Sequence, residues 1–176
     1  DLHLCDRRQR QMCIRDRIEG FYGVTGEQYL VKEGDFLALG HHKLRFYMTP
    51  MVHWPETMMT FDETDGVLFS GDGFGCFGTV DGGFLDTRIN VDKYWGEMVR
   101  YYSNIVGKYG SPVQKALQKL GGLPISAICS THGPVWTENI AKVIGIYDRL
   151  SRYDADEGVV ICLLYTSDAA DDRISV

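Results

Sequence analysis

The stretch PMVHWPETMM, residues 50–59, decides how this chain is expected to fold. It places His53 in a stiff Trp-Pro turn directly after an apolar, strand-like run. Two other stretches share this design: LFSGDGFG, residues 68–75, carries Asp72, and STHGP, residues 130–134, carries His132. Because each polar residue follows a strand-like run, we expect the three side chains to converge at one edge of a sheet, with their donor atoms pointing into a shared space.

Short apolar runs separated by turns predict the strands. Two predicted hairpins come first, one turning at residues 40–43 and one at an Asp-Gly pair, Asp65-Gly66. The five predicted strands are residues 36–39, 44–48, 58–61, 67–70 and 125–129.

Apolar residues recurring at spacings of three and four predict helices in the second half of the chain. The first spans residues 91–109 and ends at Gly110. The second spans about residues 112–120, with Pro112 in its first turn, and the third follows Thr137 as its cap. Hairpins followed by alternating helix and strand favour an α/β sandwich with mixed sheets.

Composition excludes several classes of protein. The chain has 176 residues and a formal net charge of −6 at pH 7, without a basic stripe, which argues against nucleic acid as a partner. No apolar run approaches the roughly 20 residues that span a membrane, so we expect no membrane contact. Of the five cysteines, Cys76 and Cys129 lie outside the two end segments that are discussed next. They lack the spacing of a metal-binding pair, which favours free thiols in a reducing compartment, the cytoplasm.

The two end segments of the chain are related through their back-translated DNA sequences, not through their amino-acid sequences. Residues 7–16 back-translate as CGT CGG CAG CGT CAG ATG TGT ATA AGA GAC, and residues 162–171 as TGT CTC TTA TAC ACA TCT GAC GCT GCC GAC. The second string is the reverse complement of the first, apart from a frame offset at the edges. This inverted repeat resembles a transposase-type sequencing adapter, so residues 1–17 and 162–176 are expected to be adapter translation. The alternative is two disordered tails, one basic and one acidic.

His, Asp and His from three strand ends form a donor set for metal ions. Neutral imidazole suits iron or zinc, and one carboxylate can bridge two cations about 3.5–4 Å apart. Three ligands do not saturate two metals, so the others are expected upstream of Ile18. His41 and His42 lie in a predicted hairpin tip and are expected to be surface or structural residues, and Cys76 is expected to pack rather than to bind metal.

Residues 18–161 resemble the flavodiiron proteins, or A-type flavoproteins. The resemblance rests on four runs, at residues 50–62, 68–75, 100–105 and 130–136. The most specific is HWPE, residues 53–56, which hydrolases of the same fold lack. The resemblance implies an α/β fold of the metallo-β-lactamase type, an αββα sandwich with mixed sheets and flanking helices, of which residues 18–153 are the C-terminal part.

The resemblance also implies a role for each site residue. His53 would ligate one iron, Asp72 would bridge both irons, and His132 would ligate the other. The remaining ligands of the family lie in a His-x-Glu-x-Asp-His motif on an earlier loop, which this sequence does not contain. Trp54 and Glu56 become candidates for supporting the irons on the side from which electrons arrive, or are packing residues of the turn. No catalytic residue beyond the metal ligands is implied.

Cofactors and partners follow from the same resemblance. The family reduces dioxygen to water, or nitric oxide to nitrous oxide, at a non-haem diiron centre that receives electrons through FMN. FMN binds a C-terminal flavodoxin-like domain, and residues 154–161 are expected to be its hinge and first strand, so this chain should hold no FMN-binding residue. Rubredoxin or a fused domain would donate electrons, and head-to-tail homodimers would bring FMN of one subunit near the irons of the other.

Two alternatives stay open. A metal-dependent hydrolase of the same superfamily, such as a thioesterase or phosphodiesterase, would use a metal-bound water as nucleophile. The second position of the upstream motif distinguishes a hydrolase from a diiron protein. It is Glu in diiron proteins and His in hydrolases. The other alternative concerns the chain by itself, which is expected to be inactive because it carries half of the ligands and half of the sandwich, leaving an apolar sheet face exposed.

Overall fold

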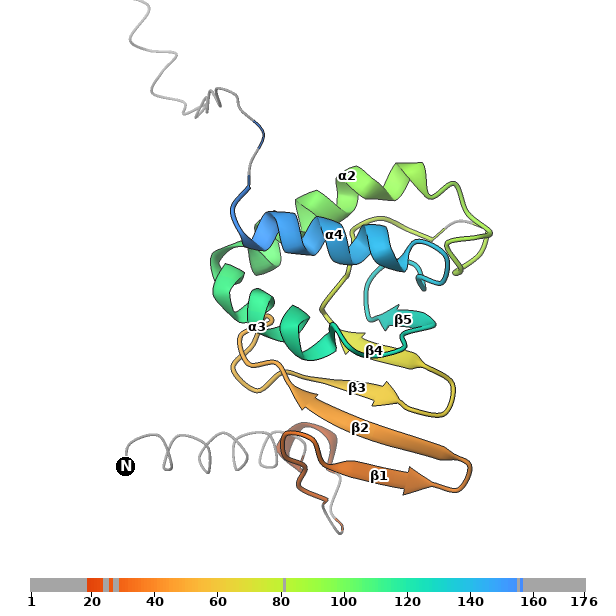
Figure 1. Ribbon diagram of the computed structural model, residues 1–176, viewed down its shortest axis with the longest axis vertical. Coiled ribbons are helices and arrows are strands. Elements are labelled where there is room, and N and C mark those ends of the chain that lie inside the picture. The colour runs from red at the N-terminus through yellow and green to blue at the C-terminus, as the bar shows by residue number, and fades with distance from the viewer. Residues whose placement is uncertain (1–18, 24–25, 27–28, 81, 155, 157–176) are drawn as a thin grey trace, which may run out of the picture.

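The computed structural model describes residues 19–23, 26, 29–80, 82–154 and 156. Five strands form one mixed sheet in the order β1-β2-β3-β4-β5 (Figure 1). Strands β1 to β4 pair antiparallel with their neighbours, and β5 pairs parallel to β4. The strand predictions are confirmed, with ends shifted by at most two residues, as β1 Phe36–Leu39, β2 His42–Met48, β3 Met58–Asp62, β4 Val67–Gly71 and β5 Ala127–Ser130.

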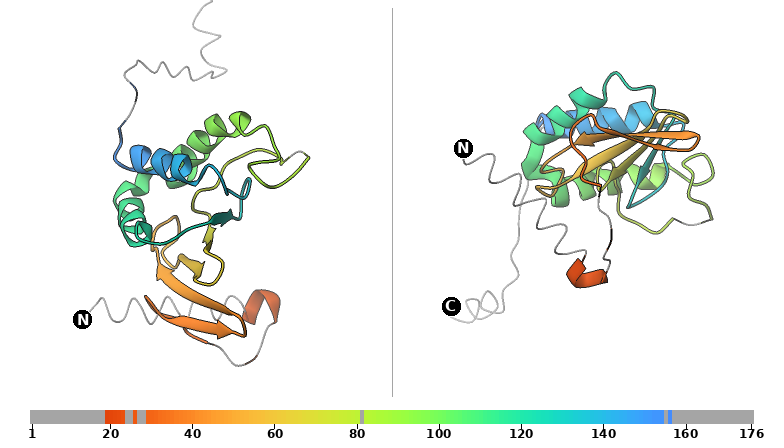
Figure 2. Two further views of the ribbon diagram at one scale, coloured as in Figure 1. Left: turned by 45° about the vertical axis from the view of Figure 1, so that its right-hand side comes forward. Right: turned by 90° about the horizontal axis from the view of Figure 1, so that it is seen from below.

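Helices follow β4 and β5. Helix α2 (Asp92–Tyr101) continues through a π-helical turn, η1 (Tyr102–Val106), and a 3-10 turn, η2 (Gly107–Tyr109), into helix α3 (Gly110–Leu120), and helix α4 (Ile140–Ser151) follows β5. The helices gather at the β4–β5 end of the sheet, whereas β1 and β2 extend away from them (Figures 1 and 2). No helix among the described residues is long and apolar enough to cross a membrane.

The predicted helix over residues 91–109 is helical throughout, but it is not one α-helix. The side chain of Ser103 donates to the carbonyl of Val99 at 2.8 Å, and that of Asn104 to the carbonyl of Arg100 at 2.9 Å. Side-chain bonds to carbonyls four residues back compete with the α-helical ladder, and they lie within the π-helical turn. Apolar spacing alone did not reveal this competition.

Two predicted helix boundaries are wrong. Gly110 begins α3 rather than ending the helix before it, and a Cβ there would lie 2.4 Å from the carbonyl oxygen of Ser151. This glycine therefore permits close packing between α3 and the end of α4. Helix α4 begins at Ile140 with Asn139 as its N-cap, not directly after Thr137. The hydroxyl of Thr137 instead donates to the distant carboxylate of Asp86 at 2.6 Å.

One face of the sheet forms the core with the helices. Alternate residues of the central strands, Met59, Phe61, Leu68 and Ile128, are at most 2% exposed and belong to one cluster with buried helical residues. The register places them on the same face, since Phe61 lies opposite Leu68, and Leu68 opposite Ile128. This packing, which follows from the period-two pattern of the strands, fixes the register in which the strands pair.

The other face of the sheet is apolar and partly uncovered. Leu39, Met58 and Phe69 lie on it and are 53%, 41% and 48% exposed. The pairing of Leu39 with His42, Met58 with Met48, and Phe69 with Thr60 gives all three the same side of the sheet. This arrangement agrees with the expectation that an apolar sheet face is exposed in this chain.

Candidate metal centre

His53, Asp72 and His132 come together at the edge of the sheet where β4 and β5 end. Asp72 directly follows β4, His132 follows β5, and His53 lies in the connection between β2 and β3. The Nε2 atom of His53 is 3.2 Å from Oδ2 of Asp72, and the Nε2 atom of His132 is 3.5 Å from Oδ1. The predicted convergence is therefore observed, while metal binding by these residues stays a prediction.

The donor set fits two bridged cations. A first-row cation bound about 2.0–2.2 Å from an imidazole nitrogen and from a carboxylate oxygen, at an angle near 90–110°, separates these two atoms by about 3.0–3.5 Å. Each imidazole nitrogen faces a different oxygen of Asp72 at such a distance, 3.2 Å and 3.5 Å. Both histidines therefore suit one cation each, with the carboxylate of Asp72 between the two.

The ends of β4 and β5 are tied to each other through one carbonyl group. The oxygen of Gly71, whose φ is +58°, accepts from the backbone nitrogen of Thr131 at 2.9 Å and from the hydroxyl of Ser130 at 3.1 Å. A left-handed residue at this point suits glycine, because a side chain would be strained. The result is that Asp72 and His132 leave the sheet side by side.

Two side chains that sequence reasoning missed hold the centre together. The hydroxyl of Thr131 donates to Oδ1 of Asp72 at 2.7 Å. The hydroxyl of Tyr101 donates to the backbone oxygen of Asp72 at 3.2 Å, and its ring lies 5.7 Å from the ring of His132. Thr131 could have been suspected from its place beside His132, but nothing in the sequence links Tyr101, 29 positions away, to Asp72.

The loop of His53 is a compact turn. The hydroxyl of Thr57 lies 2.5 Å from the carbonyl oxygen of Thr49 and 2.9 Å from that of Trp54, and it donates to one of them at a time. Trp54 is 55% exposed, with its indole 5.9 Å from the ring of His53. Glu56 is half-buried in the same turn. The positions of Trp54 and Glu56 beside His53 are compatible with both of their predicted roles.

Cys76 packs beneath the centre, as expected. It is 1% exposed, and burial, with a smaller effect of Glu97, raises the pKa of its thiol to about 12. Its backbone nitrogen donates to the carbonyl oxygen of His132 at 3.2 Å. A protonated, buried thiol is a poor metal ligand, since the thiolate is the ligating form.

Replacing Gly133 with alanine is expected to destabilise the chain by about 2–3 kcal/mol, because the new Cβ meets a close neighbour in a strained backbone. The φ of Gly133 is +92°, and a Cβ there would lie 2.4 Å from Sγ of Cys76. Urea unfolding measures this loss. Gly122→Ala is the matched control, since a Cβ at Gly122 meets nothing within 4 Å, and an equal loss in both variants would contradict the explanation.

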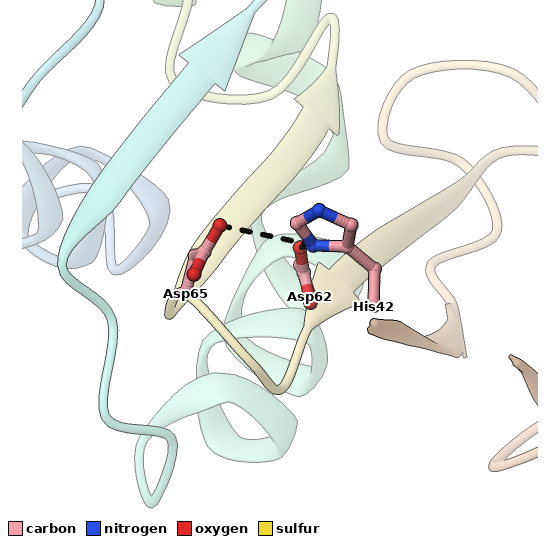
Figure 3. A group of neighbouring side chains, drawn as sticks. All are labelled: His42, Asp62 and Asp65. Atoms are coloured by element: carbon pink, nitrogen blue, oxygen red, sulfur yellow. Dashed lines mark hydrogen bonds and ion pairs between the residues drawn. The ribbon is translucent and has the colours of Figure 1, made fainter. Parts of the chain in front are cut away.

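A second cluster of polar side chains, His42, Asp62 and Asp65, lies at the opposite end of β4 (Figure 3). Nδ1 of His42 is 2.6 Å from Oδ2 of Asp62 and 3.7 Å from Oδ2 of Asp65. The other oxygen of Asp62 accepts from the backbone nitrogen of Thr64 at 2.9 Å. The 2.6 Å contact is a hydrogen bond, so this cluster joins the β1–β2 hairpin to the β3–β4 turn. His42 is thus structural, in line with the prediction.

The contribution of Asp62 to stability is expected to be lost at low pH. Burial alone would raise the pKa of this carboxyl, but hydrogen bonds from Thr64 and His42 outweigh burial and lower the pKa below its ordinary value of 3.8. A lowered folded-state pKa stabilises above the unfolded-state value, and the gain disappears as pH falls through the folded-state value. The stability difference between the wild type and Asp62→Asn should therefore shrink below about pH 4 in denaturant titrations. A constant difference from pH 6 to pH 3 would contradict this.

Comparison with known proteins places the chain among proteins with iron and flavin. The family described as ODP family beta lactamase matches residues 9–133. The anaerobic nitric oxide reductase flavorubredoxin of Salmonella paratyphi A is 33% identical over 150 residues, which cover 84% of this chain and 28% of that protein. This chain therefore spans less than a third of that relative.

Solved structures give the same result. A variant of the flavo di-iron protein from Thermotoga maritima is 31% identical, with a TM-score of 0.71 over 80% of this chain and 35% of that one. The rubredoxin oxygen:oxidoreductase from Desulfovibrio gigas is 29% identical, with a TM-score of 0.70 over 78% of this chain and 35% of that one. The described sheet and helices therefore match about a third of each larger protein.

Proposed function

Because this chain belongs to the ODP family of β-lactamase-like domains and to the flavodiiron proteins, we propose that it is part of an oxidoreductase that reduces dioxygen or nitric oxide. The names of its relatives include a nitric oxide reductase and an oxygen oxidoreductase, which supports both substrates. These names favour an oxidoreductase over the hydrolase alternative.

In this proposal, residues 18–153 are part of the diiron domain. Residues 154–161 lead into a flavodoxin-like domain that binds FMN, and residues 1–17 and 162–176 are adapter translation. Of these end segments, the structure describes only residues 154 and 156. The match of this chain to about a third of each solved relative supports the idea that the active protein is longer.

His53, Asp72 and His132 would hold two iron ions, with Asp72 between them. The irons would supply the redox chemistry that reduces the substrate. The observation that carries the proposal is the arrangement of two imidazole nitrogens at 3.2 Å and 3.5 Å from the two oxygens of one carboxylate. A carboxylate between two histidines suits iron, because imidazole and carboxylate are both ligands that iron accepts.

The residues of this chain prepare the centre for such ions. Thr131 and Tyr101 hold the carboxylate and the backbone of Asp72, and Gly133 lets the backbone after His132 lie against Cys76. Phe74 and Cys76, 2% and 1% exposed, follow Asp72 closely in the chain, and Cys76 packs against the backbone of Gly133, directly after His132.

Electrons would arrive from FMN on the side of the exposed Trp54 and of Glu56. We propose a head-to-tail homodimer in which the FMN of one subunit reaches the irons of the other, with rubredoxin or a fused domain as the donor. One of the solved relatives is named a rubredoxin oxygen:oxidoreductase, which supports this donor class. Cys76 and Cys129 are free thiols, which supports a cytoplasmic location.

Sequencing the native gene across both ends of this reading frame tests the proposal. It should reveal an upstream His-x-Glu-x-Asp-His motif and a downstream flavodoxin-like domain. The extended protein should then bind two irons and one FMN per chain, and it should consume dioxygen or nitric oxide when reduced rubredoxin is supplied. An upstream motif with His in its second position, together with thioester or phosphodiester hydrolysis, would overturn the proposal in favour of a hydrolase.

A further inference from the structure

The carboxylate of Asp72 receives a hydrogen bond from one side chain among the described residues, that of Thr131. The hydroxyl of Thr131 lies 2.7 Å from Oδ1 of Asp72 and 3.1 Å from the carbonyl oxygen of Gly71. A hydroxyl carries one hydrogen, so it donates to one of these acceptors at a time. The shorter contact, to a charged acceptor, is the stronger of the two.

Thr131 is itself firmly placed. Its backbone nitrogen donates to the carbonyl oxygen of Gly71 at 2.9 Å, which ties it to the end of β4. Its β-branched side chain has restricted rotation about χ1, which limits the positions that its hydroxyl can take. A fixed donor can select one orientation of a carboxylate that would otherwise rotate.

The selected orientation matters because the two oxygens of Asp72 face different partners. Oδ1, which accepts from Thr131, is the oxygen 3.5 Å from His132, and Oδ2 is 3.2 Å from His53. We propose that Thr131 is a positioning residue that holds the carboxylate of Asp72 between the two histidines, with one oxygen toward each, and so prepares it to lie between two cations. This inference rests on the proposed function and adds a residue to it.

The first experiment uses the metal-free chain. Three-bond coupling constants from NMR report the χ1 rotamer of Asp72. We expect one dominant rotamer in the wild type and in Thr131→Ser, and rotamer averaging in Thr131→Val, which keeps the shape of the side chain but removes the donor. Thr60→Val, in the middle of β3, is the matched control and should keep one rotamer. Averaging in the wild type, or one rotamer in Thr131→Val, would overturn the inference.

The second experiment is a titration with Co²⁺, followed by its d–d absorption. Hydrogen-bond partners of metal ligands typically contribute about 10–100-fold to metal affinity. We expect Co²⁺ binding to weaken about tenfold or more in Thr131→Val, with Thr131→Ser and Thr60→Val close to the wild type. Equal affinity in Thr131→Val and the wild type would contradict a positioning role.

The two experiments separate the inference from the function on which it rests. A longer chain that includes the upstream ligands and still binds no Co²⁺ would count against the proposed metal centre, and the rotamer measurement would still decide the role of Thr131. Co²⁺ binding with the same spectrum and affinity in all variants would support the metal centre and contradict a positioning role for Thr131.

Discussion

Asp86→Ala is expected to lower the free energy of unfolding by about 3–4 kcal/mol, since it removes a buried charged acceptor that several donors share. Asp86 is 2% exposed and accepts from the backbone nitrogens of Thr137, Glu138 and Asn139 at 3.1, 3.1 and 2.9 Å. It also accepts from the side chains of Thr137 and Asn139. The carboxylate therefore fixes the loop that leads into α4 and its N-cap Asn139, and it places a negative charge near the helix N-terminus, where such a charge is favoured.

Thermal unfolding measures this effect, with a fall in Tm of roughly 10 °C expected for a chain of this size. Asp92→Ala is the matched control, because Asp92 is exposed and accepts one hydrogen bond, from the indole of Trp95 at 3.1 Å. The control should change Tm little. Similar shifts in the two variants would contradict this role of Asp86 in the loop before α4.

Replacing Asp86 is also expected to loosen the loop that follows His132 of the metal centre. The backbone nitrogen of Asp86 donates to the carbonyl oxygen of Val135 at 3.0 Å, and Leu85 forms a bridge with Val135. Val135 lies three positions after His132 in the loop between β5 and α4. The Asp86→Ala variant is therefore expected to show faster amide hydrogen exchange in this loop as well as a lower Tm.

Asp72→Asn is expected to weaken Co²⁺ or Zn²⁺ binding by at least about 100-fold, because it removes the negative charge and one of the two oxygen donors between the histidines. The amide that replaces the carboxylate has one acceptor oxygen and cannot bridge two cations through two oxygens. The two imidazoles at 3.2 Å and 3.5 Å would then lack their shared partner. Competition against a chelating dye measures the affinity.

Asp65→Asn is the control for metal binding, since it removes a carboxylate of the distal cluster while leaving the proposed centre unchanged. Loss of binding in Asp65→Asn with retention in Asp72→Asn would move the metal site to the His42 cluster and contradict the proposed centre. The thermal stability of the metal-free Asp72→Asn variant should stay close to that of the wild type, because the side chain of Asp72 is 29% exposed.

The strands of this protein were predictable because their signals are local. The alternation in β3 and β4 and the Asp65-Gly66 turn between them act over a few residues, and the structure places both strands within one residue of the prediction. The helix over residues 91–109 was predictable in extent but not in type, because Ser103 and Asn104 bond to the backbone inside it. The start of α4 was misplaced because Thr137 and Asn139 donate to Asp86, which lies about fifty positions earlier in the chain.

The three proposed metal ligands were also predictable, but the side chains that hydrogen-bond to Asp72 were not. His53, Asp72 and His132 each carry a local mark, a polar residue directly after an apolar run, and parallel pairing of β4 with β5 brings two of them to one edge. Thr131 carries no mark in the sequence apart from its place beside His132. Tyr101 reads as one apolar position of an amphipathic helix, although its hydroxyl reaches the backbone of Asp72.

The sequence by itself determined which residue types stand at the strand ends, the positions of the strands and the family to which the chain is similar, since these depend on short-range pattern and composition. Tertiary structure alone decided that one oxygen of Asp72 faces each histidine, that Thr131 and Tyr101 hold Asp72 there, and that Asp86 accepts from the loop before α4. Such contacts join residues from 19 positions apart, as in His53 and Asp72, to 60 positions apart, as in Asp72 and His132. They exist only after the chain has folded, because packing rather than local preference sets the distances between their atoms.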